Sequence, residues 1–168
     1  CPKFAESQKL APGLGVSLYL ADCYERIGRS ASAFKEFKKA EELAIARKDP
    51  RSGLAHARAA NLEPNVPTMT IHVPAEARVA GLEIKRDDTV VPEKDWEVAV
   101  PIDPGLHLII ASAPGRRSKD IPQKVKSAEK NIVTLPVLED PNAIVAAPVG
   151  ATTRPNGAND GNAALGGA

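Results

Sequence analysis

The sequence predicts an α+β protein in which helical hairpins precede a small antiparallel β-sandwich and a disordered tail. Two changes of pattern along the 168 residues support this prediction. Apolar residues recur at helical spacing near the N-terminus, and from Thr68 they alternate with polar residues. Towards the C-terminus Ala, Gly, Asn and Pro dominate, and these residues cannot form a core. We therefore expect a helical segment at 1–66, a β-sandwich at 67–139 and a disordered linker at 140–168.

The first segment is rich in Ala, Leu, Lys and Glu, which are strong helix formers. Gly28 separates two predicted helices, and Ser30 or Ser32 is expected to cap the second. A further helix from about Arg51 to Leu62 ends before Pro64, because proline disfavours helix at the residue before it. The apolar stripes predict a hairpin whose contacts are Leu20, Tyr24 and Ile27 in its first helix and Ala33, Phe37, Ala40 and Ala44 in its second.

The second segment has the two-residue period of β-strands. Met69, Ile71 and Val73 point to one face of the first predicted strand, with polar residues between them. Several short strands separated by turn residues are typical of a β-sandwich. The further strands are expected at Leu82 to Arg86, Val98 to Ile102, Leu106 to Ser112, Ile121 to Lys126 and Ile132 to Leu138.

The stretch PIDPGLHLIIASAPGRR, residues 101–117, places one of these strands between two Pro-Gly turns. Its two faces are both largely apolar, with Leu106, Leu108 and Ile110 on one side and His107, Ile109 and Ala111 on the other. Such a pattern favours a central strand that is buried on both faces. We expect the second sheet to cover one face and the helical segment to cover the other.

The segment LADCYERIGRSASAFKEFKKA, residues 20–40, resembles one tetratricopeptide repeat, a helix-turn-helix unit with a period of about 34 residues. The matching positions are Leu20, Ala21, Tyr24, Gly28, Ala33, Phe37 and Ala40. The resemblance implies stacked helices with a concave groove for a protein or peptide partner.

Family geometry places four residues along that groove: Leu18, Asp22, Glu25 and Arg26. Their mixed charge fits peptide binding, and it fits a solvated helix face equally well. The clamp of basic and Asn side chains that binds peptide termini in some repeats is not matched, because Asp22 replaces the Asn.

Residues 68–138 resemble the PEGA-type β module of bacterial envelope proteins. The name-giving motif reads PAEARV, in which Pro74, Ala77 and Val79 match and Glu76 replaces glycine. The module's Gly-x-His motif, followed by Pro-Gly, is matched by the stretch PGLHLIIASAPG, and its closing strand is matched by NIVTLPVL. The resemblance implies a periplasmic or cell-envelope location, with a possible membrane tether outside this chain.

Charge and hydropathy disfavour two classes of partner. With 22 Lys and Arg against 21 Asp and Glu, the net charge of +1 gives no general attraction to nucleic acid or to anionic lipid. No apolar run approaches the roughly 20 residues of a membrane-spanning helix. We expect no nucleic-acid partner.

The sequence holds no recognisable catalytic signature, since neither a nucleophile elbow nor a zinc-protease motif is present. His56, His72 and His107 fall in different predicted elements, so no metal site is expected. The acidic pairs Asp87-Asp88 and Glu93 with Asp95 are interpreted as solvated turns. We expect a protein that is not an enzyme and that needs no cofactor.

Cys1 and Cys23 are the two cysteines of the chain. We expect no disulfide framework, and interpret Cys23 as a small buried thiol within the helical hairpin. Cys1 at the first position fits either a fragment or a processed bacterial lipoprotein whose first residue carries the lipid.

These observations favour a non-catalytic scaffold at the bacterial cell envelope, with the helical groove binding a protein or peptide and the β module acting as a spacer. The alternative is a module that binds carbohydrate or peptidoglycan, a cell-wall polymer, through Tyr19, Trp96 and the pair Arg116-Arg117. An exposed Trp96 would favour the alternative, and a buried Trp96 would favour the scaffold.

Overall fold

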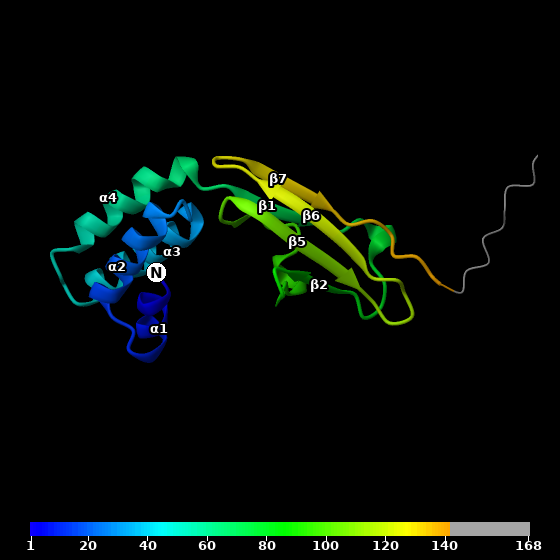
Figure 1. Cartoon of the computed structure of the whole chain (residues 1–168), viewed down its shortest axis with the longest axis horizontal. Coiled ribbons are helices and arrows are strands. Elements are labelled where there is room, and N and C mark those ends of the chain that lie inside the picture. The colour runs from blue at the N-terminus through cyan, green and yellow to red at the C-terminus, as the bar shows by residue number, and fades with distance from the viewer. Residues whose placement is uncertain (142–168) are drawn as a thin grey trace, which may run out of the picture.

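The computed structural model describes residues 1–141 and has the predicted α+β architecture (Figure 1). The four α-helices of residues 1–141 lie at one end of the β-sandwich, and the described chain leaves the sandwich at the opposite end. Almost all of the predicted linker, residues 140–168, lies outside the described residues. Within residues 1–141 no helix is long and apolar enough to cross a membrane.

The helical segment contains the predicted hairpin and the predicted third helix, together with a short helix at the N-terminus. The bounds are α1 Pro2–Leu10, α2 Leu14–Arg26, α3 Ser30–Ala46 and α4 Ser52–Leu62. The second and third of these helices form the hairpin, and the fourth packs on α3. The 3-10 turn Glu63–Asn65 then leads into the strands.

The buried stripe of α3 is confirmed, because Ala33, Phe37, Ala40 and Ala44 are all buried. Fully buried alanines let the helices approach closely. The prediction of a buried stripe on α2 is wrong at its last residue, Ile27. Ile27 is 58% exposed, because the helix ends at Arg26 and the chain turns away at Gly28, whose φ of +76° favours glycine.

The predicted serine cap is also wrong. Arg29 holds the N-cap position of α3 and makes no side-chain cap hydrogen bond. The hydroxyl of Ser30 has no hydrogen-bond partner among the described residues, and Ser32 lies inside the helix. A carboxylate from the β-sandwich caps this helix instead.

A disulfide bond joins Cys1 to Cys23, with 5.5 Å between their Cα atoms. This finding corrects two expectations, because Cys23 is not a free buried thiol and the chain does hold a structural disulfide. The bond links the start of α1 to the last turns of α2. Since the Cys1 sulfur is used in this bond, it cannot carry a thioether lipid at the same time.

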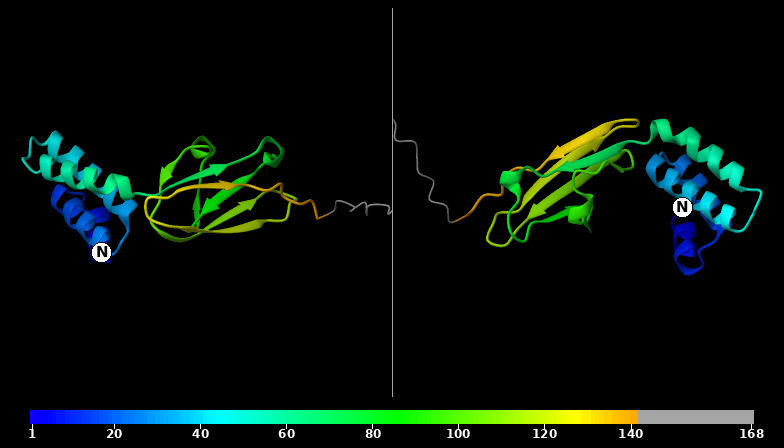
Figure 2. Two further views of the ribbon diagram at one scale, coloured as in Figure 1. Left: turned by 90° about the horizontal axis from the view of Figure 1, so that it is seen from above. Right: turned by 180° about the vertical axis from the view of Figure 1, so that it is seen from behind.

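The strands form two stacked sheets (Figure 2). One has the order β4-β1-β7 and the other β3-β2-β5-β6. Antiparallel pairing predominates as expected, but β1 and β7 are parallel. The bounds are β1 Thr68–His72, β2 Glu83–Arg86, β3 Thr89–Val90, β4 Val100–Pro101, β5 Gly105–Ser112, β6 Lys119–Val125 and β7 Lys130–Thr134, with 3-10 turns at Ala75–Ala77 and Glu93–Asp95.

The core of the sandwich lies between the two sheets. Met69, Ile71 and Val73 are buried, which confirms the predicted inner face of β1. Ile84 of β2 and Ile109 of β5 meet them from the other sheet. Alternating side chains of both inner faces thus interdigitate, as in other aligned sandwiches.

The prediction that β5 is buried on both faces is wrong for one face. The strand is central in its sheet, and Ile109 and Ala111 are buried. On the other face Leu106 is 75% exposed and Leu108 is exposed as well. The helical segment lies beyond the end of the sandwich rather than over this face, so solvent reaches these side chains (Figure 1).

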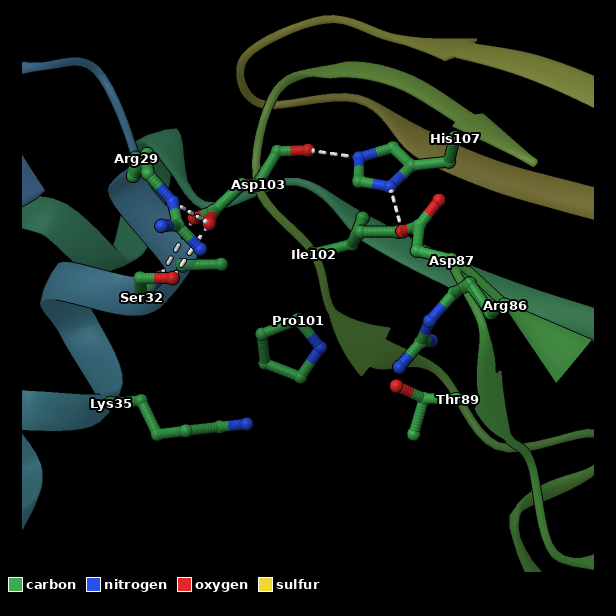
Figure 3. Close-up of a pocket in the computed structure, with 11 residues that line it drawn as sticks. Arg29, Ser32, Lys35, Arg86, Asp87, Thr89, Pro101, Ile102, Asp103 and His107 are labelled. Atoms are coloured by element: carbon green, nitrogen blue, oxygen red, sulfur yellow. Dashed lines mark hydrogen bonds and ion pairs between the residues drawn. The ribbon is translucent and has the colours of Figure 1, made fainter. Parts of the chain in front are cut away.

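The helical segment and the sandwich meet at Asp103, between β4 and β5 (Figure 3). One carboxylate oxygen accepts a hydrogen bond from the Ser32 amide at 2.8 Å. The other accepts from the Ser32 hydroxyl at 2.6 Å and from Arg29 Nε at 2.8 Å. Asp103 therefore caps α3 from the other half of the molecule, where the helix dipole favours a negative charge.

Candidate functional site

A groove of about 360 Å³ lies between α2 and α4, with α3 beneath it. Leu18 and Asp22 line it from α2, and Phe37 of α3 contributes from the hairpin core. Two of the four predicted groove residues are thus brought together in one concavity. Its volume is within the range of about 300 to 1,000 Å³ that is typical of ligand sites.

Two apolar side chains of the groove face solvent, Tyr19 at its rim and Leu54 in its wall. Tyr19 is 66% exposed and Leu54 is 55% exposed. The Tyr19 ring is stacked on Phe4 of α1, with 5.9 Å between the ring centroids. This stack limits the freedom of the tyrosine at the mouth of the groove, and rigid aromatic side chains are common at protein interfaces.

Arg58 of α4 bridges the two acidic residues predicted on α2. Its Nη2 nitrogen lies 3.2 Å from Asp22 Oδ1 and is also paired with Glu25 Oε2. The guanidinium lies over the Phe37 ring, 5.0 Å from the centroid, which adds a cation–π interaction. Hydrogen bonding to Glu25 raises the pKa of Arg58 despite partial burial. The charges at the centre of the groove are thus held in place and mutually compensated.

Arg26 and Glu25 are placed differently from the expectation. Arg26 is exposed and makes an ion pair with Asp22 at 2.9 Å, one helical turn away, without lining the groove. Glu25 supports the groove through Arg58 and does not line it either. The solvated-face interpretation therefore fits Arg26 better than the binding interpretation.

The far wall of the groove includes Arg51, at the start of α4. Its guanidinium donates to both carboxylate oxygens of Asp49, at 2.9 and 2.7 Å. These hydrogen bonds, and one from the Arg51 amide, lower the pKa of Asp49 to about 2. At neutral pH the ionised Asp49 therefore fixes the position of the Arg51 side chain in this wall.

Sequence reasoning missed the contribution of α4. Leu54 and Arg58 are four residues apart, and this spacing places two residues on one face of a helix. This spacing is visible in the sequence, but nothing in it reveals that the shared face turns towards α2.

Trp96 and the pair Arg116-Arg117 of the alternative carbohydrate site have partners within the fold, whereas Tyr19 is exposed at the mouth of the groove. Trp96 is buried, 9% exposed, and its indole nitrogen donates to the Val91 carbonyl at 3.2 Å. Arg116 approaches Asp140 at 4.0 Å, and Arg117 approaches Glu139 at 3.6 Å.

The three histidines lie in separate elements, as predicted, and each pairs with one carboxylate. His56 contacts Glu41, His72 contacts Glu97 and His107 contacts Asp87. Among residues 1–141 no group of three or more His, Cys, Asp or Glu side chains is arranged to hold a metal ion.

Comparison of the chain with protein-family models and with curated proteins finds no match.

Proposed function

We propose that this chain is a non-catalytic scaffold of the bacterial cell envelope, in which the groove between α2 and α4 binds a peptide segment of a protein partner. The observation that carries the proposal is the groove itself. It combines an apolar wall at Leu18 and Leu54 with an exposed aromatic rim at Tyr19. Its central charges are compensated within the fold, so affinity comes from apolar anchors of the peptide.

The arrangement of the two halves supports the spacer role of the sandwich. The helices lie at one end of the sandwich and the described chain leaves at the other (Figure 1). A tether on the C-terminal side would therefore hold the groove away from its anchor by the length of the sandwich. The tetratricopeptide and PEGA resemblances point to the same combination of a binding unit and an envelope module.

The disulfide between Cys1 and Cys23 supports the envelope location. Structural disulfides persist in oxidising compartments such as the bacterial periplasm and are rare in the cytosol. The buried Trp96 favours the scaffold over the carbohydrate-binding alternative, because sugar recognition by an aromatic ring needs an accessible face.

Peptide selection tests the groove directly. Random peptides displayed on phage are selected on the intact chain, and the enriched peptides are synthesised and titrated by fluorescence polarisation. We expect Leu54→Glu to weaken their binding at least tenfold, because the substitution places a charge in the apolar wall. Ile45→Glu is the matched control, since Ile45 is an equally exposed apolar residue of α3 outside the groove.

Two results would contradict the proposal. One is that no peptide is enriched above the background of the uncoated surface. The other is that the enriched peptides bind Leu54→Glu as tightly as they bind the unchanged protein.

A further inference from the structure

A second cavity, of about 240 Å³, lies at the junction of the helical segment and the sandwich (Figure 3). The start of α3 lines one side, and β2, β3 and the β4–β5 connection line the other. This cavity shares no lining residue with the proposed peptide groove, and none of the four predicted groove residues lines it.

Some of the charged groups in this cavity are already paired. Asp103 accepts hydrogen bonds from Ser32 and Arg29. Asp87 pairs with Nδ1 of His107, whose Nε2 lies 2.7 Å from the Asp103 carbonyl. Both carboxylates of the lining are therefore occupied by partners within the fold.

Two cations of the lining form no salt bridge within residues 1–141, although the charge of Arg86 helps to lower the pKa of the adjacent Asp87. Lys35 of α3 and Arg86 of β2 contact no carboxylate within residues 1–141, and they face the cavity from opposite sides beside Pro101 (Figure 3). Without His107, the lining carries three cationic side chains, since Arg29 is also present, and two carboxylates. The formal charge of the lining is therefore positive.

Arg86 has an unmet hydrogen-bonding requirement. Its Nη1 nitrogen is buried from solvent and has no hydrogen-bond partner within residues 1–141. A buried polar atom without a partner costs free energy, more so when the group is charged, and an anion that accepts a hydrogen bond from it would remove that cost. The Thr89 hydroxyl, next to Arg86 in the lining, is a further donor.

We propose that this junction cavity binds a phosphate-type oxyanion, either as the free ion or as the terminal phosphate group of a larger molecule. The Arg86 guanidinium, the Lys35 ammonium and the Thr89 hydroxyl donate to its oxygens. Arginine matches the geometry of phosphate oxygens well, and hydrogen bonds between charged groups are stronger than neutral ones. The small volume fits an ion or a single phosphate group. Because Lys35 belongs to α3 and Arg86 to the sandwich, the bound anion ties the two halves together.

Titration calorimetry of the intact chain with inorganic phosphate tests the site, at an ionic strength held constant with sodium chloride. We expect saturable binding and an increase in the thermal midpoint. Arg86→Gln and Lys35→Gln should each weaken the binding at least tenfold, as expected for loss of a charge-assisted hydrogen bond. Lys39→Gln is the matched control, because Lys39 is an exposed lysine of the same helix outside the cavity. This variant should bind phosphate with the affinity of the unchanged protein.

Glycerol 1-phosphate distinguishes the two sources of the ligand. Binding of this monoester as tight as that of phosphate supports a phosphate group on a larger molecule, and binding of phosphate alone supports the free ion. The proposal is overturned if neither compound gives saturable binding. It is also overturned if Arg86→Gln and Lys35→Gln, shown to be folded by circular dichroism, bind phosphate as tightly as Lys39→Gln does.

Discussion

The carboxylate of Asp103, in the sandwich, accepts hydrogen bonds from both the backbone amide and the hydroxyl of Ser32, although the two residues are 71 positions apart in the sequence. The same carboxylate pairs with Arg29, so both residues at the start of α3 depend on the β half of the molecule. The helix end and the junction between the two halves are therefore one structural unit.

Asp103→Ala should destabilise the protein by about 1 to 3 kcal/mol, because it removes a helix cap and leaves the Ser32 amide without its partner. Urea unfolding followed by circular dichroism measures the loss. Asp120→Ala is the control, since Asp120 is an exposed carboxylate of β6 and its removal should change the free energy of unfolding by less than about 0.5 kcal/mol. Equal effects of the two substitutions would mean that the Asp103 contacts do not form.

The contribution of Asp103 should depend on pH. Burial alone would raise the pKa of this carboxyl, but the hydrogen bonds from Ser32 and the charge of Arg29 outweigh burial, so the pKa lies below its ordinary value of 3.8. A carboxyl whose pKa is lowered by folding stabilises the protein above its unfolded-state pKa, and this stabilisation is lost as the pH falls through the folded-state pKa. The difference in unfolding free energy between the unchanged protein and Asp103→Ala should be constant from pH 7 to about pH 5 and shrink below about pH 4. A difference that stays constant down to pH 2.5 would contradict this assignment.

Local patterns in the sequence predicted the elements and most of the core. The alternation of Met69, Ile71 and Val73 specified the inner face of β1, and the spacing of Phe37 and Ala40 specified the buried stripe of α3. These predictions succeed because burial of one face imposes a period that is visible within a few residues.

The errors concern relations between distant segments. The apolar outer face of β5 gave no sign that the helices stand beyond the end of the sandwich, which leaves Leu106 exposed. The disulfide depends on the path that brings Cys1 beside α2, and the cap of α3 depends on a carboxylate from the other half. The same limit applies to the groove, where Arg58 reaches Asp22 and Glu25 only after α4 has packed on the hairpin.

Phe37→Ala should cost about 3 to 5 kcal/mol, because it empties the centre of the helical hairpin. Phe37 is buried against Ala21 and Ala59, and Arg58 loses its aromatic surface in the variant. Chemical unfolding measures the loss. The matched control is Phe4→Ala, which removes a partly exposed ring and should cost less than about 1.5 kcal/mol. A loss below about 1 kcal/mol for Phe37→Ala would show that the hairpin is packed differently.

Reduction of the Cys1–Cys23 bond should lower the free energy of unfolding by about 3 kcal/mol, since the bond closes a loop across a sequence separation of 22 residues and so restricts the unfolded chain. The unchanged protein is unfolded in urea with and without a reductant, and Cys23→Ser serves as the control that reductant should leave unaffected.

Intact mass spectrometry of protein purified from an oxidising compartment supplies an independent measurement. Alkylation under denaturing conditions should add no alkyl group before reduction and two after it. One alkyl group added before reduction, together with a lipid mass on Cys1, would show that the first residue is lipidated and that the disulfide does not form in the cell.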